Sequence, residues 1–243
     1  MYLPEPNKNR CEISSEAMIL ALETSGRTGS VALGTTNRLL AEIQFSAQMR
    51  HSAELFPTIQ TLLKNVNGTP ADIKQVYVSI GPGSFTGLRI ALAFAKTMSL
   101  AIGSKIVAVD TLDAIAAGGA EYIDSKDLQV NRIATILDAK RGQFFTAVYE
   151  HNDGWQKTLP DCLMTPDEFL QKFASQTPIH LLGEGLVYYK DKFKADTVSF
   201  LDESLWPPKA SQIYQLGLKK AAAQQFSDPL TLQPLYLRLA LET

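Results

Sequence analysis

The sequence predicts an α/β protein of two lobes in which one plan of strands and helices occurs twice. Short apolar runs alternate with segments of helical periodicity along the 243 residues, a pattern that indicates sheets covered by helices. An apolar strand, an acidic residue, a basic residue, a glycine and a second apolar strand follow one another in both halves. The length is sufficient for two lobes with their own cores.

The first half opens with three expected strands and a helix. The apolar run ILALE at residues 19–23 is typical of a buried strand, and the turn-forming cluster TSGRTG follows at residues 24–29. Residues 30–34 and 39–45 are the next two expected strands. A helix is expected over residues 52–64, where apolar side chains recur at helical spacing. Its apolar face consists of Leu55, Ile59, Leu62 and Leu63.

Two strands and a long helix complete this half. Residues 75–80 and 105–109 are the expected strands, and residues 88–102 form the helix between them. One face of this helix consists of Ala91, Ala95, Met98 and Ile102. The opposite face consists largely of Ile90, Ala93, Leu100 and Ala101. A surface helix normally shows one apolar stripe, so we expect its own sheet to cover one side. A second helix or a partner protein would cover the other.

The second half follows a similar plan. Residues 132–138 and 143–150 are expected strands joined by a short turn, and residues 166–173 form a short helix. A further strand is expected at residues 179–182. The last helix, at residues 209–226, is long enough to pack back on the first lobe. In the repeated hairpin, Glu23, Arg27 and Gly29 correspond to Asp138, Arg141 and Gly142.

The sequence pattern predicts five segments. Residues before Met18 contain prolines and asparagines without an apolar run, so we expect a flexible extension, and Met18 is a candidate start. The segments are an extension at 1–17, an N-terminal lobe at 18–112, a C-terminal lobe at 113–208, a returning helix at 209–226 and a tail at 227–243.

The composition excludes several classes of protein. The chain is 45% hydrophobic and 20% charged with a net charge of −2, so neither disorder nor a global electrostatic grip on nucleic acid is indicated. Its two cysteines, Cys11 and Cys162, are far apart and favour a reducing compartment. Neither a secretory signal nor an uninterrupted apolar run of bilayer length occurs, so we expect a cytoplasmic protein without a membrane span.

The segment GPGSFTGLR at residues 81–89 is the most informative one. It joins a buried strand to a helix, and its glycines permit positive φ and close backbone approach. The first N–H groups of the helix could bind an anion, although a plain tight turn is an equal alternative. A P-loop is disfavoured, because the lysine and Ser/Thr that should follow the last glycine are missing. The candidate phosphate-contact residues are Gly81, Gly83, Ser84, Thr86, Gly87 and Arg89.

Arg89 is the second residue of the helix as predicted from sequence. A cation there opposes the helix dipole by roughly 0.3–1 kcal/mol. We therefore expect an anion to compensate it, from a partner carboxylate, a nucleotide phosphate or a tRNA phosphate. The alternative is an exposed arginine that contacts only water.

Taken in order, these motifs resemble the TsaB family. The similarity rests on ILALETSGRTGSVAL, GPGSFTGLR, VDTLDAIA and ILDAKRGQFFTAVYE, with PLYLR near the end, and it covers residues 18 to about 150. The segment 152–207 carries little motif signal. The family commonly has aspartate where this chain has Glu23, and the extension before Met18 is unusual for it.

The resemblance implies both a fold and a role. The family has the duplicated fold of actin, Hsp70 and sugar kinases, called the ASKHA fold. Its members are accessory subunits of the bacterial machinery that makes threonylcarbamoyladenosine in tRNA. A TsaD-like subunit carries the metal and the catalysis, a TsaE-like ATPase joins, and tRNA is bound through the complex.

The same resemblance implies a docking surface on the first-lobe helices. The expected interface residues are Leu55, Ile59, Leu62, Ala91, Ala95, Met98 and Ile102. The chain alone could pair with itself through this surface as a homodimer. It needs no cofactor of its own, although ATP or ADP could bind at the interface within the complex.

An independent enzyme of the same fold is the alternative, either a phosphotransferase or a glycoprotease-like hydrolase. Catalytic relatives have two histidines four residues apart on the first helix, whereas here His51 is followed by Leu55. His151 and His180 lie in the other half without ligand spacing, so we expect no metal site.

The remaining polar candidates are also favoured as structural residues. Glu23 and Asp138 end equivalent strands, where this fold can hold Mg-nucleotide, but turn residues that accept backbone hydrogen bonds are the preferred interpretation. Ser84 does not lie in a G-x-S-x-G elbow. The basic residues Arg27, Lys140 and Arg141 are expected to be solvated turn charges, with contact to RNA phosphates as the alternative.

Overall fold

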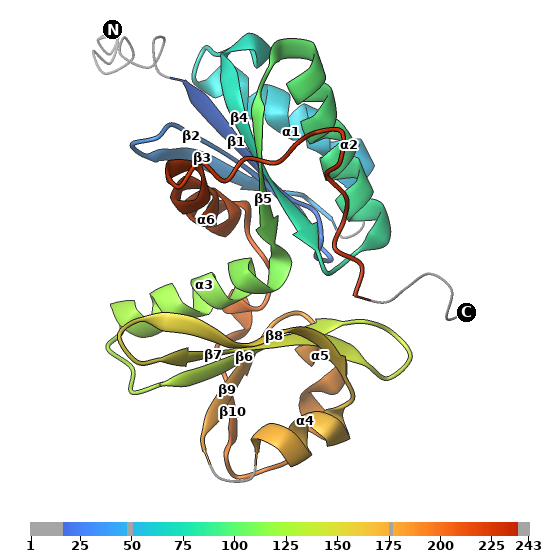
Figure 1. The fold of residues 1–243 in the computed structure, drawn as a ribbon, viewed down its shortest axis with the longest axis vertical. Coiled ribbons are helices and arrows are strands. Elements are labelled where there is room, and N and C mark those ends of the chain that lie inside the picture. Colours follow the sequence, from blue (N-terminus) through green and yellow to red (C-terminus); the bar gives the residue numbers. More distant parts are fainter. Residues whose placement is uncertain (1–16, 48–50, 175–176, 238–243) are drawn as a thin grey trace, which may run out of the picture.

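The computed structural model describes residues 17–47, 51–174 and 177–237. They form two lobes, each built on a five-stranded sheet with helices packed on it (Figure 1). Of the predicted extension only residue 17 is described, and of the predicted tail residues 227–237.

The first lobe combines one sheet with helices on both faces. Its elements are β1 (Met18–Glu23), β2 (Ser30–Gly34), β3 (Leu39–Gln44), α1 (His51–Asn65), the 3-10 helix η3 (Pro70–Asp72), β4 (Ile73–Gly81), α2 (Phe85–Ile102), β5 (Lys105–Asp110) and, from the end of the chain, α6 (Ala210–Ala222). The strand order is β3-β2-β1-β4-β5, with β1, β2 and β3 antiparallel and β4 and β5 parallel to β1. Helices α1 and α2 cover one face and α6 the other (Figure 1).

The second lobe repeats the sheet. Its elements are α3 (Thr111–Ser125), β6 (Arg132–Asp138), β7 (Phe144–His151), β8 (Trp155–Met164), α4 (Pro166–Phe173), β9 (Ile179–Leu182), α5 (Leu186–Tyr189), the 3-10 helices η4 (Lys190–Lys192) and η5 (Glu203–Leu205), and β10 (Val198–Phe200). The strand order β10-β9-β6-β7-β8, read from the other edge, again places the third, second, first, fourth and fifth strands side by side. This identical order confirms the predicted duplication and the α/β fold class.

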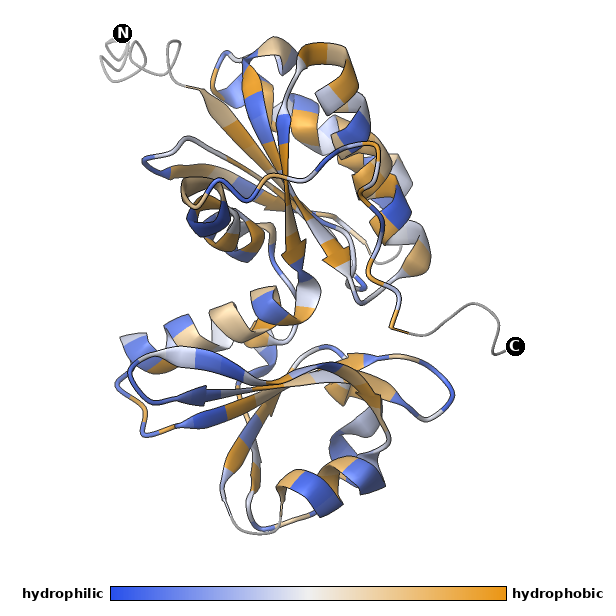
Figure 2. Cartoon of the chain, viewed as in Figure 1, coloured by the Kyte–Doolittle hydropathy of each residue, from blue (hydrophilic) through white to orange (hydrophobic). Residues whose placement is uncertain are grey.

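Strand β1 is buried on both faces. Leu20 and Leu22 pack with residues of α1 and α2, whereas Ile19 and Ala21 pack with Tyr214 of α6. Because side chains alternate between the faces of a strand, a strand covered on both sides is apolar throughout, as ILALE is. Figure 2 shows hydrophobic residues along β1, β4 and β5.

The two connecting helices are exchanged between the lobes. Helix α3 follows the last strand of the first sheet but packs on the second, through Leu112, Ile115 and Ile123. Helix α6 follows the second sheet but packs on the first, where a Cβ at Gly217 would lie 2.2 Å from Cδ2 of Tyr77. Lys220 of α6 also donates to the carbonyl oxygen of Ala108 on β5 at 2.9 Å. Each lobe is therefore completed by a helix from the other half of the chain.

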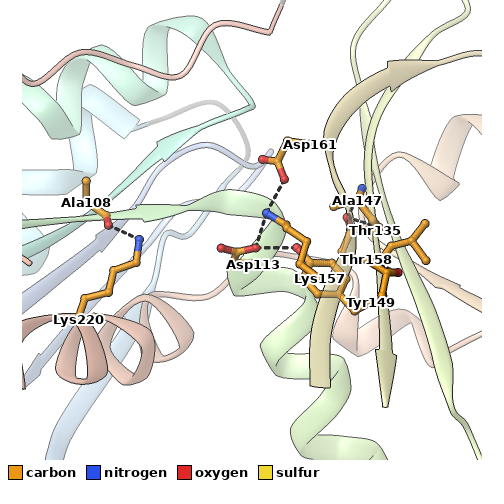
Figure 3. Close-up of polar contacts among 10 residues, drawn as sticks. Ala108, Asp113, Thr135, Ala147, Tyr149, Lys157, Thr158, Asp161 and Lys220 are labelled. Carbon is orange, nitrogen blue, oxygen red and sulfur yellow. Dashed lines mark hydrogen bonds and ion pairs between the residues drawn. The ribbon is translucent and has the colours of Figure 1, made fainter. Parts of the chain in front are cut away.

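A polar network fixes the first turn of α3 to the second sheet (Figure 3). Oδ1 of Asp113 accepts a hydrogen bond from the Tyr149 hydroxyl at 2.7 Å and pairs with Nζ of Lys157 at 2.6 Å. Nζ of Lys157 also lies 2.6 Å from Oδ1 of Asp161. Burial raises the pKa of Asp161, and the ion pair with Lys157 opposes that shift. The start of α3 is thus held by charge as well as by packing.

Several boundaries differ from those predicted. Helix α2 begins at Phe85 rather than residue 88, because Ser84 caps it by accepting a hydrogen bond from the Gly87 N–H. Neither α3 nor β8 is predicted by the sequence pattern. By length and composition alone α2 could cross a membrane, but Leu88 and Ala91 on one face of it are buried against the sheet.

Candidate functional site: the glycine turn, the α1–α2 face and the hairpin tips

The glycine turn lies directly on the loop between β1 and β2. The Ser84 N–H donates to the carbonyl oxygen of Ser25 at 2.8 Å, and the Thr24 hydroxyl donates to the carbonyl oxygen of Gly87 at 2.8 Å. A Cβ at Gly87 would lie 1.9 Å from the carbonyl oxygen of Thr24, and one at Gly83 would lie 2.6 Å from that of Ser25. The glycines therefore permit two backbones to touch.

Polar groups of the glycine turn already form hydrogen bonds within the chain. The Gly87 N–H donates to Oγ of Ser84 at 3.3 Å, and Gly81 adopts φ 117°, a conformation that favours glycine. Thr86 is exposed, and so is Phe85. Ser84 acts as a helix cap, which is a structural role.

Glu23 is buried beneath this contact. Its side chain is inaccessible to solvent, and Oε1 accepts hydrogen bonds from the N–H and hydroxyl of Ser25. Burial raises the pKa of Glu23 to about 7, although the bonds from Ser25 and Ser79 lower it, and the nearby Glu184 carboxylate raises it further. At neutral pH the carboxyl is therefore divided between its protonated and ionised forms.

His51 is packed at the start of α1 rather than presented to a ligand. It is 3% exposed, and its ring centroid lies 5.8 Å from that of Phe45. Burial lowers the pKa of His51, so the neutral form is favoured. Leu55, at the position of a second histidine, is fully buried. Among the described residues, no group of three or more His, Cys, Asp or Glu side chains is placed to hold a metal ion.

Five of the seven predicted interface residues belong to the core of their own lobe. Leu55, Ile59, Leu62, Ala91 and Ala95 are between 0% and 5% exposed. The prediction that these side chains line a surface is wrong, because both helices turn these faces to the sheet. Met98 is half-buried, and Ile102 is exposed at the end of α2.

The outward face of α1 and α2 carries other apolar side chains. Phe56 is 58% exposed and packs edge-on against the half-buried Phe94 at 5.6 Å between ring centroids. Ala93 is exposed, and Leu100 at the end of α2 is 70% exposed. We call Phe56, Ala93, Phe94 and Leu100 the outer face. The second apolar side predicted for this helix is therefore present and uncovered in the described chain.

The C-terminal segment runs across this part of the first lobe (Figure 1). Leu232 is buried in the first-lobe core, and the Leu235 N–H donates to the carbonyl oxygen of Ile80 at 2.7 Å. Tyr236 stacks on Phe85 with ring centroids 5.4 Å apart. We call residues 227–237 the strap, because they connect the end of α6 to the glycine turn.

Arg89 joins the strap to α2. Its Nε donates to the Tyr236 hydroxyl at 3.1 Å, and its guanidinium carbon lies 3.6 Å from the centroid of the Phe85 ring. Arg89 is the fifth residue of α2, which begins at Phe85, so it lies beyond the first turn, where the helix dipole acts. The structure gives this arginine partners within the chain, whereas the predicted anion remains an expectation.

Replacing Arg89 with alanine is expected to loosen the strap without unfolding the lobe. It removes a hydrogen bond and a cation–π contact, each of which stabilises by about 1 kcal/mol. Hydrogen exchange at the Leu235 N–H should therefore accelerate by roughly ten- to thirtyfold. Tyr236→Phe should give a smaller acceleration, and the two changes together should be less than additive. Unchanged exchange in Arg89→Ala would show that the strap is held elsewhere.

The tip of the second hairpin is built around Asp138. Its Oδ1 accepts the Lys140 N–H at 2.9 Å and lies 3.0 Å from the buried Tyr189 hydroxyl, while Oδ2 pairs with Nζ of Lys140 at 2.6 Å. Asp138 therefore accepts a backbone hydrogen bond within the turn, as the preferred interpretation of the sequence predicted. Burial opposes ionisation, but these hydrogen bonds and the charge of Lys140 keep the pKa of Asp138 low.

Other sequence candidates lie apart from these sites. His151 contacts the Trp155 ring, and His180 is half-buried on β9. Cys162 is a free, half-buried thiol on β8, whereas Cys11 lies outside the described residues. Two residues of these sites were not predicted. Phe56 belongs to no motif, and Tyr236 lies in PLYLR, where the sequence gives no sign that it contacts Phe85 and Arg89. A groove of about 760 Å³ runs between α3, α6 and β7–β8, lined in part by Asp113, Tyr149 and Lys157.

Comparison with known proteins assigns the chain to a family. A family model described as "TsaD: tRNA N6-adenosine threonylcarbamoyltransferase" matches residues 39–230. The tRNA threonylcarbamoyladenosine biosynthesis protein TsaB of Bacillus subtilis is 31% identical over 227 residues, which cover 91% of this chain and 94% of that protein. The chain belongs to the TsaB family.

Solved structures agree with the TsaB fold. YeaZ from Pseudomonas aeruginosa superposes with a TM-score of 0.76 at 21% identity, covering 91% of this chain and 100% of that one. A second Pseudomonas aeruginosa protein, described as similar to the peptidase YeaZ, gives 0.77 at 22% identity with the same coverage. The resemblance found in the motifs is thus confirmed over nearly the whole chain, including the segment 152–207 that carried little signal.

Proposed function

We propose that this TsaB-family chain is a non-catalytic accessory subunit that docks on a TsaD-like catalytic partner for threonylcarbamoyladenosine modification of tRNA. The observation that supports it is the outer face of α1 and α2, where Phe56 and Leu100 are more than half exposed. Exposed apolar patches of this kind mark protein interaction sites. The TsaB relatives are named as tRNA threonylcarbamoyladenosine biosynthesis proteins, and these names suggest the pathway.

A partner of the same architecture fits this surface. The outer face is built from two adjacent helices, and helices of a related lobe could pack on it by the same ridges and grooves. The small side chain of Ala93 would allow close approach between the exposed rings and the end of α2. In the absence of the partner, the same face could pair two copies of the chain, and sedimentation at several concentrations measures that equilibrium.

The other components are assigned to the assembled complex. We propose that a TsaE-like ATPase and the tRNA associate with the complex and that ATP or ADP binds at a subunit interface rather than to this chain alone. Placement in the cytoplasm follows from the same proposal. Backbone groups of the glycine turn already form hydrogen bonds within the chain, and Glu23 is buried. Both observations favour an accessory subunit over an independent phosphotransferase.

Charge on the outer face is expected to abolish docking. Phe56→Glu and Ala93→Glu each place a carboxylate where the partner would cover it, and a buried unpaired charge costs several kcal/mol. Affinity for the TsaD-like subunit should fall by at least a hundredfold, as measured by titration calorimetry or co-purification. Both side chains are exposed here, so the variants should fold, with Phe56→Glu losing only the edge-on contact with Phe94.

The matched control is Gln171→Glu, an equally exposed change on α4 of the other lobe, which should bind normally. Normal binding by both outer-face variants would refute this interface. The accessory role itself would be contradicted if the chain alone hydrolysed ATP or modified tRNA and if that activity disappeared in Glu23→Ala.

A further inference from the structure

The tips of the two repeated hairpins meet at one exposed tyrosine. Arg27 comes from the β1–β2 turn, Lys140 and Arg141 from the β6–β7 turn, and Tyr188 from α5. The Arg27 guanidinium carbon lies 5.7 Å from the centroid of the Tyr188 ring, and Nζ of Lys140 lies 5.3 Å from it. The ring, 52% exposed, is thus flanked by cations from both lobes.

Two further contacts fix this arrangement. The Arg27 N–H donates to Oε2 of Glu184 at 2.7 Å, which links the first hairpin to the second lobe next to α5. Asp138 holds the second hairpin through the Lys140 N–H. The patch is therefore positioned by buried or half-buried carboxylates beneath it, while the Lys140 side chain remains 76% exposed.

Two basic residues of the second hairpin adopt a left-handed backbone conformation, which is unfavourable for residues with long side chains. Lys140 has φ 63° and Arg141 has φ 56°, values that glycine, asparagine or aspartate adopt more readily. Strained positions of this kind occur disproportionately at functional sites. Here the strain places two adjacent positive charges at an exposed tip.

The patch contains three cationic side chains, Arg27, Lys140 and Arg141. Nζ of Lys140 pairs with Oδ2 of Asp138, and the backbone N–H of Arg27 donates to Oε2 of Glu184. Burial raises the pKa of Glu184, and the hydrogen bond and charge of Arg27 oppose that shift. The hydrogen bond to Asp138 raises the pKa of Lys140, and the charge of the nearby Arg27 opposes that shift.

We propose that this patch of Arg27, Lys140, Arg141 and Tyr188 binds a single-stranded segment of RNA, with phosphates on the cations and a base stacked on the tyrosine ring. Alternating cations and an exposed aromatic ring are the combination that single-strand binding sites use. Arginine and lysine neutralise phosphates, and an exposed aromatic ring can stack with any base. The proposal rests on the proposed function, which makes tRNA the RNA substrate of the complex.

The test uses the full chain and a fluorescent, unstructured RNA of about twelve nucleotides, with anisotropy measured between 50 and 200 mM salt. Tyr188→Ala should weaken binding by roughly five- to a hundredfold, the effect of losing one stacked base. Its salt dependence should be unchanged. Lys140→Glu with Arg141→Glu should weaken binding by at least tenfold and lower the salt slope by about 2.

Two controls separate this site from general charge effects. Tyr188→Phe keeps the ring and should bind as the wild type does. Lys64→Glu with Lys126→Glu makes the same change in net charge at exposed positions away from the patch and should lower affinity by less than threefold.

Absence of RNA binding by the wild-type chain would overturn the proposal, as would equal losses in the patch and control variants. If ATP displaced the RNA from the patch and Tyr188→Ala had no effect on RNA binding, the proposed ligand would be a nucleotide and not RNA. Docking on the TsaD-like subunit is measured separately with the same variants. Normal docking without RNA binding leaves the accessory role intact, whereas RNA binding without docking refutes that role alone.

Discussion

Replacing Gly87 with alanine is expected to destabilise the chain by about 3 kcal/mol. The new Cβ would lie 1.9 Å from the carbonyl oxygen of Thr24, in a contact between two backbones that cannot move independently. The first turn of α2 would have to separate from the β1–β2 loop, and the hydrogen bond from the Thr24 hydroxyl would be lost. Thermal unfolding should show a fall in Tm of roughly 10 °C.

The matched control is Gly118→Ala in the interior of α3. Nothing lies closer than 3.7 Å to the Cβ of such a residue, so the space is sufficient. Alanine is favoured over glycine in a helix by about 0.5–1 kcal/mol, and this variant should be slightly more stable than the wild type. If Gly87→Ala unfolded at the same temperature as the wild type, the close approach of the two backbones would be refuted.

Replacing Glu23 with glutamine is expected to stabilise the chain above pH 7 and to have little effect near pH 4.5. The folded state raises the pKa of Glu23 from 4.5 to about 7, so its stability contribution is fully present below pH 4.5 and is lost as the pH rises to 7. The corresponding free energy is about 3 kcal/mol. Glutamine fills the same space without ionising, so the variant should gain that amount at pH 8.

Chemical unfolding of both proteins at pH 4.5, 6 and 8 measures this difference directly. His51 acts in the opposite direction, because its lowered pKa destabilises the fold as the pH falls below 6.5, but it is common to both proteins and cancels. Glu203→Gln, an exposed change, should shift stability by less than about 0.5 kcal/mol at every pH. A constant difference between Glu23→Gln and wild type across this range would mean that folding does not shift the pKa of Glu23.

The duplicated fold could be predicted because each first strand is apolar on both faces and each hairpin carries its own turn signal. Strand β8 could not, because Pro160 and the charged residues around it hide the pattern. It is an edge strand with an irregular register opposite Thr146 and Val148, where a proline is tolerated. Helix α3 was missed although its sequence TLDAIAAGGAEY includes a recognised motif, since its two glycines weaken the helical signal.

The orientation of α2 shows what a helical wheel cannot decide. Both of its faces are apolar, and only the sheet determines which one is buried. The face with Gly87, Ala91 and Ala95 allows the closest approach to β4, so the bulkier Phe94 and Leu100 remain outside. Contacts between distant segments were equally invisible, as the pairing of Arg89 with Tyr236 and the meeting of Arg27 with Tyr188 demonstrate.

The exchanged helices have a consequence for how the protein is made. The first sheet leaves the ribosome early, but α6 and the strap, which cover its second face and its edge, are synthesised only after the whole second lobe. Until then Tyr77 and its neighbours on that face remain open to water, so the N-terminal lobe cannot complete its core before the second lobe has been made. A nascent chain of this design depends on residues 210–237 for cooperative folding, and ribosomal stalling before them leaves an apolar sheet face for chaperones to bind.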